Sequence, residues 1–243
     1  MNKNKLSFSN GNAKLKGIHT FSLPAGFSCP GASLCLSRAN RETGKITDGA
    51  NTQFRCYAAS AESLFKTTRK SRWNNFEQLK ACKSKQEMVD LITMSLPSKA
   101  KIVRIGASGD FYSQTYFDAW LQVADSRKDI LFYAYTKSIP FYLARKDSIP
   151  FNFKVTVSRG GKFDHLITDD LKSVTVVFSK KEATSKGLKL DKTDKLAYTG
   201  DKSFALLLHN TQPANTPAAK AWQVIKANEG GYKADYFAGY ATK

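Results

Sequence analysis

The stretch "KIVRIGASGDFYSQTYFDAWLQVADSRKDILFYAYTKS", residues 101–138, decides the fold class. It holds two short apolar runs, Ile102–Ala107 and Ile130–Tyr135, and each ends in a polar, turn-forming cluster, as buried strands do. A helix candidate, Gln114–Asp125, lies between them, with an apolar stripe at helical spacing at Phe117, Trp120, Leu121 and Ala124. A strand, a helix and a second strand in succession predict a parallel pair joined by a helical crossover.

The same alternation extends over most of the chain. Further strand candidates are Ile18–Leu23, Phe153–Val157, Val174–Phe178 and Phe204–Leu208, and further helix candidates are Ala58–Arg69, Asn74–Met94 and Ile139–Lys146. Six strands alternating with helices predict an α/β fold, specifically a partial parallel (β/α)6 barrel with a cysteine-containing loop after the first strand. With no internal repeat, residues 1–243 are expected to form a single domain, with a polar N-terminal segment (1–16) and a C-terminal tail (230–243).

The chain is strongly basic. Lys and Arg number 38 against 20 Asp and Glu, which gives a formal net charge of +18. A positive field of this size attracts polyanions, so nucleic acid, DNA or RNA, is an expected partner. The alternative is that scattered lysines only keep the protein soluble.

The sequence also bears on the cellular location of the protein. It has no run of about 18 apolar residues, so no membrane span is expected. The first residues lack the apolar centre of a secretory signal, which favours a cytoplasmic location. Thiols stay reduced there, and clustered cysteines bind metal more often than each other.

Three of the four cysteines fall within residues 29–56. Cys29 and Cys35 flank "PGASL" in a loop after the first predicted strand, and Cys56 precedes a predicted helix, whose amino terminus favours a thiolate. Cys82 lies on an amphipathic stretch, where a buried cysteine is as plausible as a ligand. We therefore expect a metal site made by Cys29, Cys35 and Cys56, with Cys82 as a further candidate.

The spacing bears on which metal is bound. Structural zinc is usually held by pairs of ligands two to four residues apart, and no such pair occurs here. Iron–sulfur clusters accept more varied spacing, so a [4Fe-4S] cluster is favoured over zinc. Its fourth ligand would be Cys82, His209, a water or a substrate.

Further polar residues follow the predicted strands, and the carboxyl ends of parallel strands meet at one edge of a sheet. These residues are Asp110, Lys137, Ser158, Arg159 and His209. Asp110, Ser158, Arg159 and His209 are the ligand-binding candidates. The segment "SRGGK" (158–162) could place backbone N–H groups around an anion, or could be a plain turn.

Several motifs carry a family resemblance: "TFSLPAGFSCPGASLC" (20–35), "RCYAAS" (55–60), "VRIGASGDFYSQTYFDAW" (103–120), "LFYAYTKSIPF" (131–141), "VTVSRGGKFDHLI" (155–167) and "FALLLHNTQPA" (204–214). In these the chain resembles a bacteriophage family known as gene product 88. The resemblance implies a phage source and hence the cytoplasm of a host cell, but no reaction.

A looser resemblance is to the radical S-adenosylmethionine enzymes. It implies a cluster on Cys29, Cys35 and Cys56, with Asp110 near the methionine amine of the cofactor and Ser158 and Arg159 near its carboxylate. Those enzymes separate their cysteines by three and then two residues, whereas here the gaps are five and twenty. The departure favours cluster binding over cleavage of S-adenosylmethionine.

These observations lead to one main functional hypothesis and two alternatives. The main hypothesis is an iron–sulfur protein on a radical-enzyme-like partial barrel, with possible association with nucleic acid. The alternatives are a basic nucleic-acid-binding protein with a structural zinc site, and a divergent radical S-adenosylmethionine enzyme.

Overall fold

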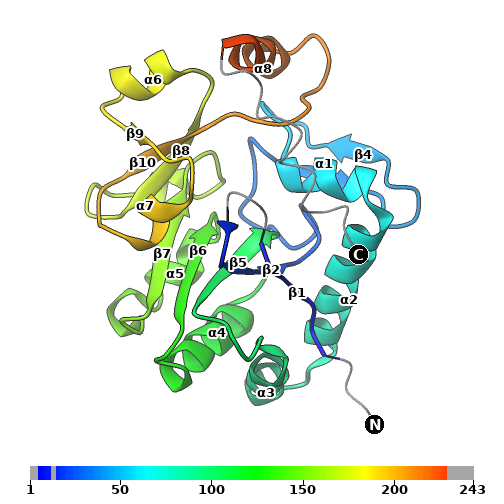
Figure 1. Ribbon diagram of the computed structural model, residues 1–243, viewed down its shortest axis with the longest axis vertical. Coiled ribbons are helices and arrows are strands. Elements are labelled where there is room, and N and C mark those ends of the chain that lie inside the picture. The colour runs from blue at the N-terminus through cyan, green and yellow to red at the C-terminus, as the bar shows by residue number, and fades with distance from the viewer. Residues whose placement is uncertain (1–4, 12–14, 229–243) are drawn as a thin grey trace.

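The computed structural model describes residues 5–11 and 15–228, and within them the main sheet has eight strands in the order β1-β2-β5-β6-β7-β8-β10-β9. The strands are β1 (Phe8–Ser9), β2 (His19–Ser22), β5 (Ile102–Ser108), β6 (Leu131–Thr136), β7 (Phe153–Ser158), β8 (Ser173–Val177), β9 (Lys189–Leu190) and β10 (Phe204–Leu207). β1 is antiparallel to β2, and the other neighbouring pairs are parallel (Figure 1). A separate hairpin pairs β3 (Ser37–Ala39) with β4 (Ile46–Asp48).

The prediction of a mixed α/β fold with a mostly parallel sheet is confirmed. Each of the six predicted strands is present, and those six neighbour one another in chain order. The sequence did not predict β1, β9 or the β3–β4 hairpin. These strands are two or three residues long, which is too short for an alternating pattern to show.

The helices are α1 (Tyr57–Leu64), α2 (Lys66–Ala81), α3 (Lys85–Ser95), α4 (Gln114–Ser126), α5 (Ile139–Leu143), α6 (Lys180–Ser185), α7 (Lys195–Tyr198) and α8 (Pro217–Asn228), with 3₁₀ turns at Lys146–Ser148 and Asp164–Leu166. α4 agrees with its prediction to within one residue. Its first turn is capped by Ser113, whose hydroxyl accepts from the backbone N–H of Tyr116. Trp120 in its apolar stripe is fully buried.

The two helices expected before β5 are instead three. Phe65 has extended backbone and separates α1 from α2, and Cys82 does the same at the end of α2. α3 then begins at an arrangement similar to a capping box: the hydroxyl of the N-cap residue Ser84 accepts from the Glu87 N–H, and the Glu87 carboxylate accepts from the N–H of the preceding residue, Lys83. The segment "SKQE" (84–87), with Ser and Glu three residues apart, is the sequence signal for this helix start.

The two faces of the main sheet differ in chemistry. One face packs against α3 and α4 in the largest apolar core, which includes Val103, Ile105 and Phe132 (Figure 1). Residues paired in parallel register share a face, so Arg104 lies beside Tyr133 on the opposite face, where Tyr135 also lies beside Thr156. The second face carries Arg104, Thr156 and the two tyrosines beside apolar side chains such as Val174 and Phe204, and the candidate site lies on it.

The predicted polar segment at the N-terminus, 1–16, lies partly within the described residues, where Leu6 and Leu15 are buried and Phe8 pairs with β2. The predicted tail, 230–243, lies outside the described residues. Among the described residues, none of the helices is long and apolar enough to cross a bilayer.

Candidate functional site

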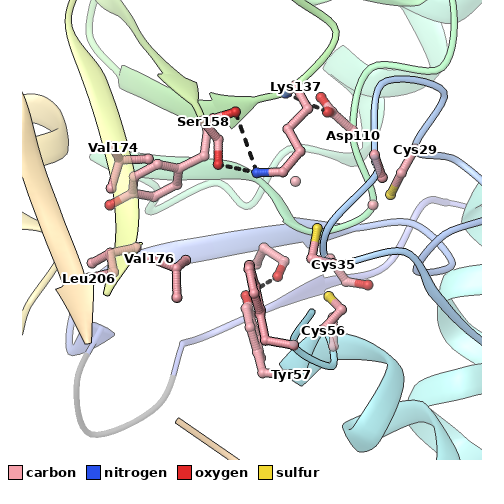
Figure 2. A pocket seen from close by; sticks show the side chains of 18 of the residues that line it. Cys29, Cys35, Cys56, Tyr57, Asp110, Lys137, Ser158, Val174, Val176 and Leu206 are labelled. Atoms are coloured by element: carbon pink, nitrogen blue, oxygen red, sulfur yellow. Dashed lines mark hydrogen bonds between the residues drawn. The ribbon is translucent and has the colours of Figure 1, made fainter. Parts of the chain in front are cut away.

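Three cysteines from two loops of the chain line one cavity of about 170 Å³. Cys29 and Cys35 lie in the loop between β2 and β3, and Cys56 immediately precedes α1. Figure 2 shows their side chains gathered on one side of the cavity, with Val174, Val176 and Leu206 across from them. The cavity is also lined by Asp110, Lys137, Ser158 and His209, which follow or end β5, β6, β7 and β10. The structure thus brings together six of the eight predicted site residues.

Close backbone packing fixes the loop that carries Cys29 and Cys35. The N–H of Leu34 donates to the carbonyl of Gly160, and the N–H of Lys162 donates to that of Gly31. Gly31 leaves no room for a side chain, because an added Cβ would lie 2.1 Å from the carbonyl oxygen of Lys137. The cysteine loop is therefore joined to the "SRGGK" loop and to the end of β6, which the sequence did not predict.

A buried carboxylate holds the start of this loop. Glu62 of α1 is fully buried, and its Oε1 accepts from the backbone N–H of Ala25 (2.9 Å), from Arg72 of α2 (2.8 Å) and from the hydroxyl of Ser108 (3.1 Å). One side chain therefore connects α1, α2, the end of β5 and the loop that leads to Cys29.

Cys56 is positioned by residues of another motif. Gln212, from the "FALLLHNTQPA" stretch, accepts from the backbone N–H of Arg55 (2.7 Å) and donates to the carbonyl of His209 (3.0 Å). Arg55 also forms a 2.6 Å ion pair with Asp48 of β4. These contacts fix the residue before Cys56 and bring His209 to the same cavity.

The surroundings of Cys29 and Cys56 favour the neutral form of these two thiols. Burial raises the pKa of Cys29, as does the nearby carboxylate of Asp110. Burial, together with Cys35, raises the pKa of Cys56 to about 11, against the opposite effect of the N–H groups of Ala58 and Ala59 at the start of α1. The expectation that the helix amino terminus would favour a thiolate at Cys56 is therefore outweighed by burial. Each of the three thiols interacts electrostatically with the other two.

Asp110 closes one side of the cavity. Burial raises its pKa, although its carboxylate accepts three hydrogen bonds: from Thr136 Oγ1 (2.6 Å), from the N–H of Lys137 (2.8 Å) and from the N–H of Phe111 (2.7 Å). The Lys137 ammonium in turn donates to the hydroxyl of Ser158 (Figure 2) and to the carbonyl of Arg159 (2.8 Å). Asp110 and Lys137 thus tie together the ends of β5, β6 and β7.

The replacement Asp110→Asn is expected to lower the free energy of unfolding by about 1–3 kcal/mol, because an amide NH₂ would face donors that now bond to a carboxylate oxygen. Urea unfolding would measure the change. Asp129→Asn, at an exposed ion pair with Arg127, is the control and should leave the midpoint unchanged. Equal midpoints for Asp110→Asn and wild type would contradict the structural role given to Asp110.

The "SRGGK" loop does not offer an open anion site. Its glycine N–H groups donate to a carboxylate of the chain itself, Gly160 to Asp164 Oδ2 (2.7 Å) and Gly161 to Asp164 Oδ1 (2.8 Å).

Arg159 does not line the cysteine cavity. It lines a neighbouring one of about 230 Å³, and its Nε donates to Ser173 Oγ (3.3 Å). The structure therefore does not bring Arg159 to the cavity that holds the other site residues.

Cys82 lies apart from the other cysteines. It ends α2, its Sγ donates to the carbonyl of Gln78 (3.4 Å), and it packs against the large apolar core. It is not among the residues that line the cavity. The structure thus does not bring Cys82 into the predicted site, and it agrees with the alternative of a core cysteine.

His209 does reach the cavity, where its ring packs on Tyr57 at a centroid distance of 5.2 Å.

Sequence reasoning missed a buried charge pair beside the site. Arg104 of β5 lines the cavity, forms an ion pair with Asp194, and lies over the ring of Tyr135 at 5.0 Å. Burial opposes its charge, but Asp194 raises the pKa of Arg104 further above its usual value. The sequence signal for this pair was Arg104 itself, a charged residue within the apolar run "IVRIGA" (102–107).

The cysteines do not form a ready site for a single ion. Among residues 5–11 and 15–228, no group of three or more His, Cys, Asp or Glu side chains is placed to hold one metal ion. The donor set is nevertheless soft, since it consists of three thiols, which suit iron–sulfur clusters and zinc better than hard cations. The three thiols face a shared cavity instead of a shared point.

The fold and the site define a mixed α/β protein whose parallel strands end at a cavity lined by cysteines. The chain belongs to the bacteriophage family Gene product 88, whose family model matches residues 1–225. This finding confirms the first resemblance drawn from the motifs.

Two curated proteins of the same name are similar to this chain. The Gene 88 protein of Mycobacterium phage D29 is 29% identical over 137 residues, which cover 52% of this chain and 50% of that protein. The Gene 88 protein of Mycobacterium phage L5 is 28% identical over 141 residues, which cover 52% and 51% respectively. This chain thus spans about half the length of the curated relatives it matches. No solved structure matches, and these comparisons give no support to the resemblance to radical S-adenosylmethionine enzymes.

Proposed function

We propose that this protein binds a [4Fe-4S] cluster through Cys29, Cys35 and Cys56. The observation that carries the proposal is the convergence of these three thiols, which span residues 29–56, on one cavity at the ends of parallel strands. Cysteine thiolates are the usual ligands of such clusters. A cysteine bound to a cluster loses its proton, so binding has to overcome the raised pKa values of Cys29 and Cys56.

The spacing of the cysteines along the chain favours a cluster over a single zinc ion. Structural zinc is usually held by pairs of ligands two to four residues apart, whereas the gaps here are five and twenty residues. Iron–sulfur clusters accept more varied spacing.

The fold is compatible with cluster binding at the ends of the strands. Strands β2, β5, β6, β7, β8 and β10 follow one another in chain order, which is the order in a partial (β/α) barrel. We propose that the sheet is such a partial barrel and that the cluster binds at the carboxyl ends of its strands. A cluster would supply electron transfer or, with three cysteine ligands, a site for a fourth ligand. His209 and Asp110 line the same cavity and are the candidates from this chain.

Anaerobic reconstitution tests the proposal. The full chain would be incubated with ferrous iron and sulfide or, in parallel, with zinc alone. We expect uptake of about four iron and four sulfide ions per chain, with the broad visible absorption of thiolate-bound iron. Uptake of zinc without uptake of iron and sulfide would favour the structural zinc alternative and would refute the cluster.

A further inference from the structure

A row of aromatic side chains extends from the cysteine loop along α2. Phe27 contacts Trp73 with ring centroids 4.8 Å apart, Trp73 contacts Phe76 at 6.0 Å, and Phe76 contacts Tyr112 at 5.1 Å. Phe27 is 41% exposed, which is unusual for a ring in a well-packed loop. The rings therefore reach the surface at Phe27.

Cations lie over three of these rings. The guanidinium of Arg38 is 5.5 Å from the centroid of Phe27, and that of Arg41 is 5.0 Å from the centroid of Trp73. The ammonium of Lys80 is 5.8 Å from the centroid of Tyr112. Each arrangement lies within the range of a cation–π interaction, which orders the long basic side chains against the rings.

The exposed face of α2 continues this basic surface. Lys66, Lys70, Trp73 and Lys80 recur at intervals of three, four or seven residues, so they share one face of the helix, and the three lysines are exposed. The acidic residue on this face is Glu77, and it pairs with Arg41. We call the set of Phe27, Arg38, Arg41, Lys66, Lys70, Trp73 and Lys80 the aromatic–basic face.

We propose that the aromatic–basic face binds single-stranded nucleic acid. Bases that are not paired can stack on Phe27 and on the flat guanidinium of Arg38, while the lysines of α2 contact successive phosphates. A duplex keeps its bases stacked inside and would use only the lysines. The net charge of +18 supplies long-range attraction to any polyanion, but the exposed ring favours the single strand. This inference does not depend on the cluster.

Fluorescence anisotropy with a labelled oligothymidylate, which forms no duplex, tests this inference on the full chain. We expect binding that weakens steeply with salt and that exceeds binding to a duplex of equal length. Phe27→Leu keeps an apolar side chain but removes the ring, and should weaken binding about fivefold or more. The double variant Arg38→Ala with Lys70→Ala should bind more weakly than Phe27→Leu, and its binding should depend less on salt than that of wild type.

Two control variants distinguish binding at the aromatic–basic face from a general effect of net charge or of exposed rings. Lys180→Ala with Lys181→Ala removes the same charge from the exposed helix α6, and Phe151→Ala removes a ring that is 69% exposed on another surface. Both should bind within about twofold of wild type. The proposal is overturned if oligothymidylate does not bind at low salt, if Phe27→Leu binds as wild type does, or if the α6 variant loses as much affinity as the Arg38 and Lys70 variant. Circular dichroism would confirm that the variants are folded.

Discussion

Replacing Glu62 with alanine is expected to lower the free energy of unfolding by about 3–5 kcal/mol, because it leaves the buried guanidinium of Arg72 without its carboxylate. It also removes the acceptor for the N–H of Ala25 and the hydroxyl of Ser108. Urea unfolding followed by circular dichroism would measure the loss. Since Ala25 leads into the cysteine loop, the variant should also bind less iron than wild type.

The double variant Glu62→Ala with Arg72→Met is the matched control. It removes both charges and fills part of the space with apolar atoms, so it should recover part of the stability lost by Glu62→Ala alone. A loss of under about 1 kcal/mol for Glu62→Ala would contradict the role of this carboxylate in joining α1, α2 and the loop.

Replacing Cys56 with serine is expected to abolish stable cluster binding, and the same holds for Cys29→Ser and Cys35→Ser. Loss of a residue that only supports a metal ligand typically costs about 10–100-fold in affinity, so loss of a ligand should cost at least as much. Iron and acid-labile sulfide assays after anaerobic reconstitution would measure the effect.

Cys82→Ala is the control for these variants, because Cys82 packs against the apolar core and does not line the cavity. It should keep the full iron and sulfide content. Loss of the cluster in Cys82→Ala with retention in Cys56→Ser would contradict the assignment of ligands.

Much of the fold could be predicted from the sequence because its strands are separated by clear turn signals. Ile102–Ala107 and Phe204–Leu208 were located to within one residue at each end, since apolar runs ended by polar clusters leave little choice. Helix boundaries were less accurate. The break at Phe65 carries no glycine or proline, and it depends on how α1 and α2 pack instead of on local preference.

The candidate site was predicted in part. Cys29 and Cys35 could be placed there because they follow a predicted strand, where parallel sheets have their sites, and Cys56 could be added because it precedes a predicted helix. Arg159 and Cys82 could not be excluded, because the direction of a side chain depends on contacts formed only in the folded chain. The same holds for Asp164, whose carboxylate accepts hydrogen bonds from the N–H groups of Gly160 and Gly161. No sequence motif connects Asp164 with these glycines, so the contact could not be predicted.

The measurement that tests the central claim most directly is anomalous scattering from iron in crystals of the anaerobically prepared full chain. The account predicts an iron–sulfur cluster in the cavity, with separate iron atoms bonded to the sulfurs of Cys29, Cys35 and Cys56 and none bonded to Cys82. A cavity that holds a single zinc ion, or iron bound elsewhere with these three sulfurs unligated, would contradict it.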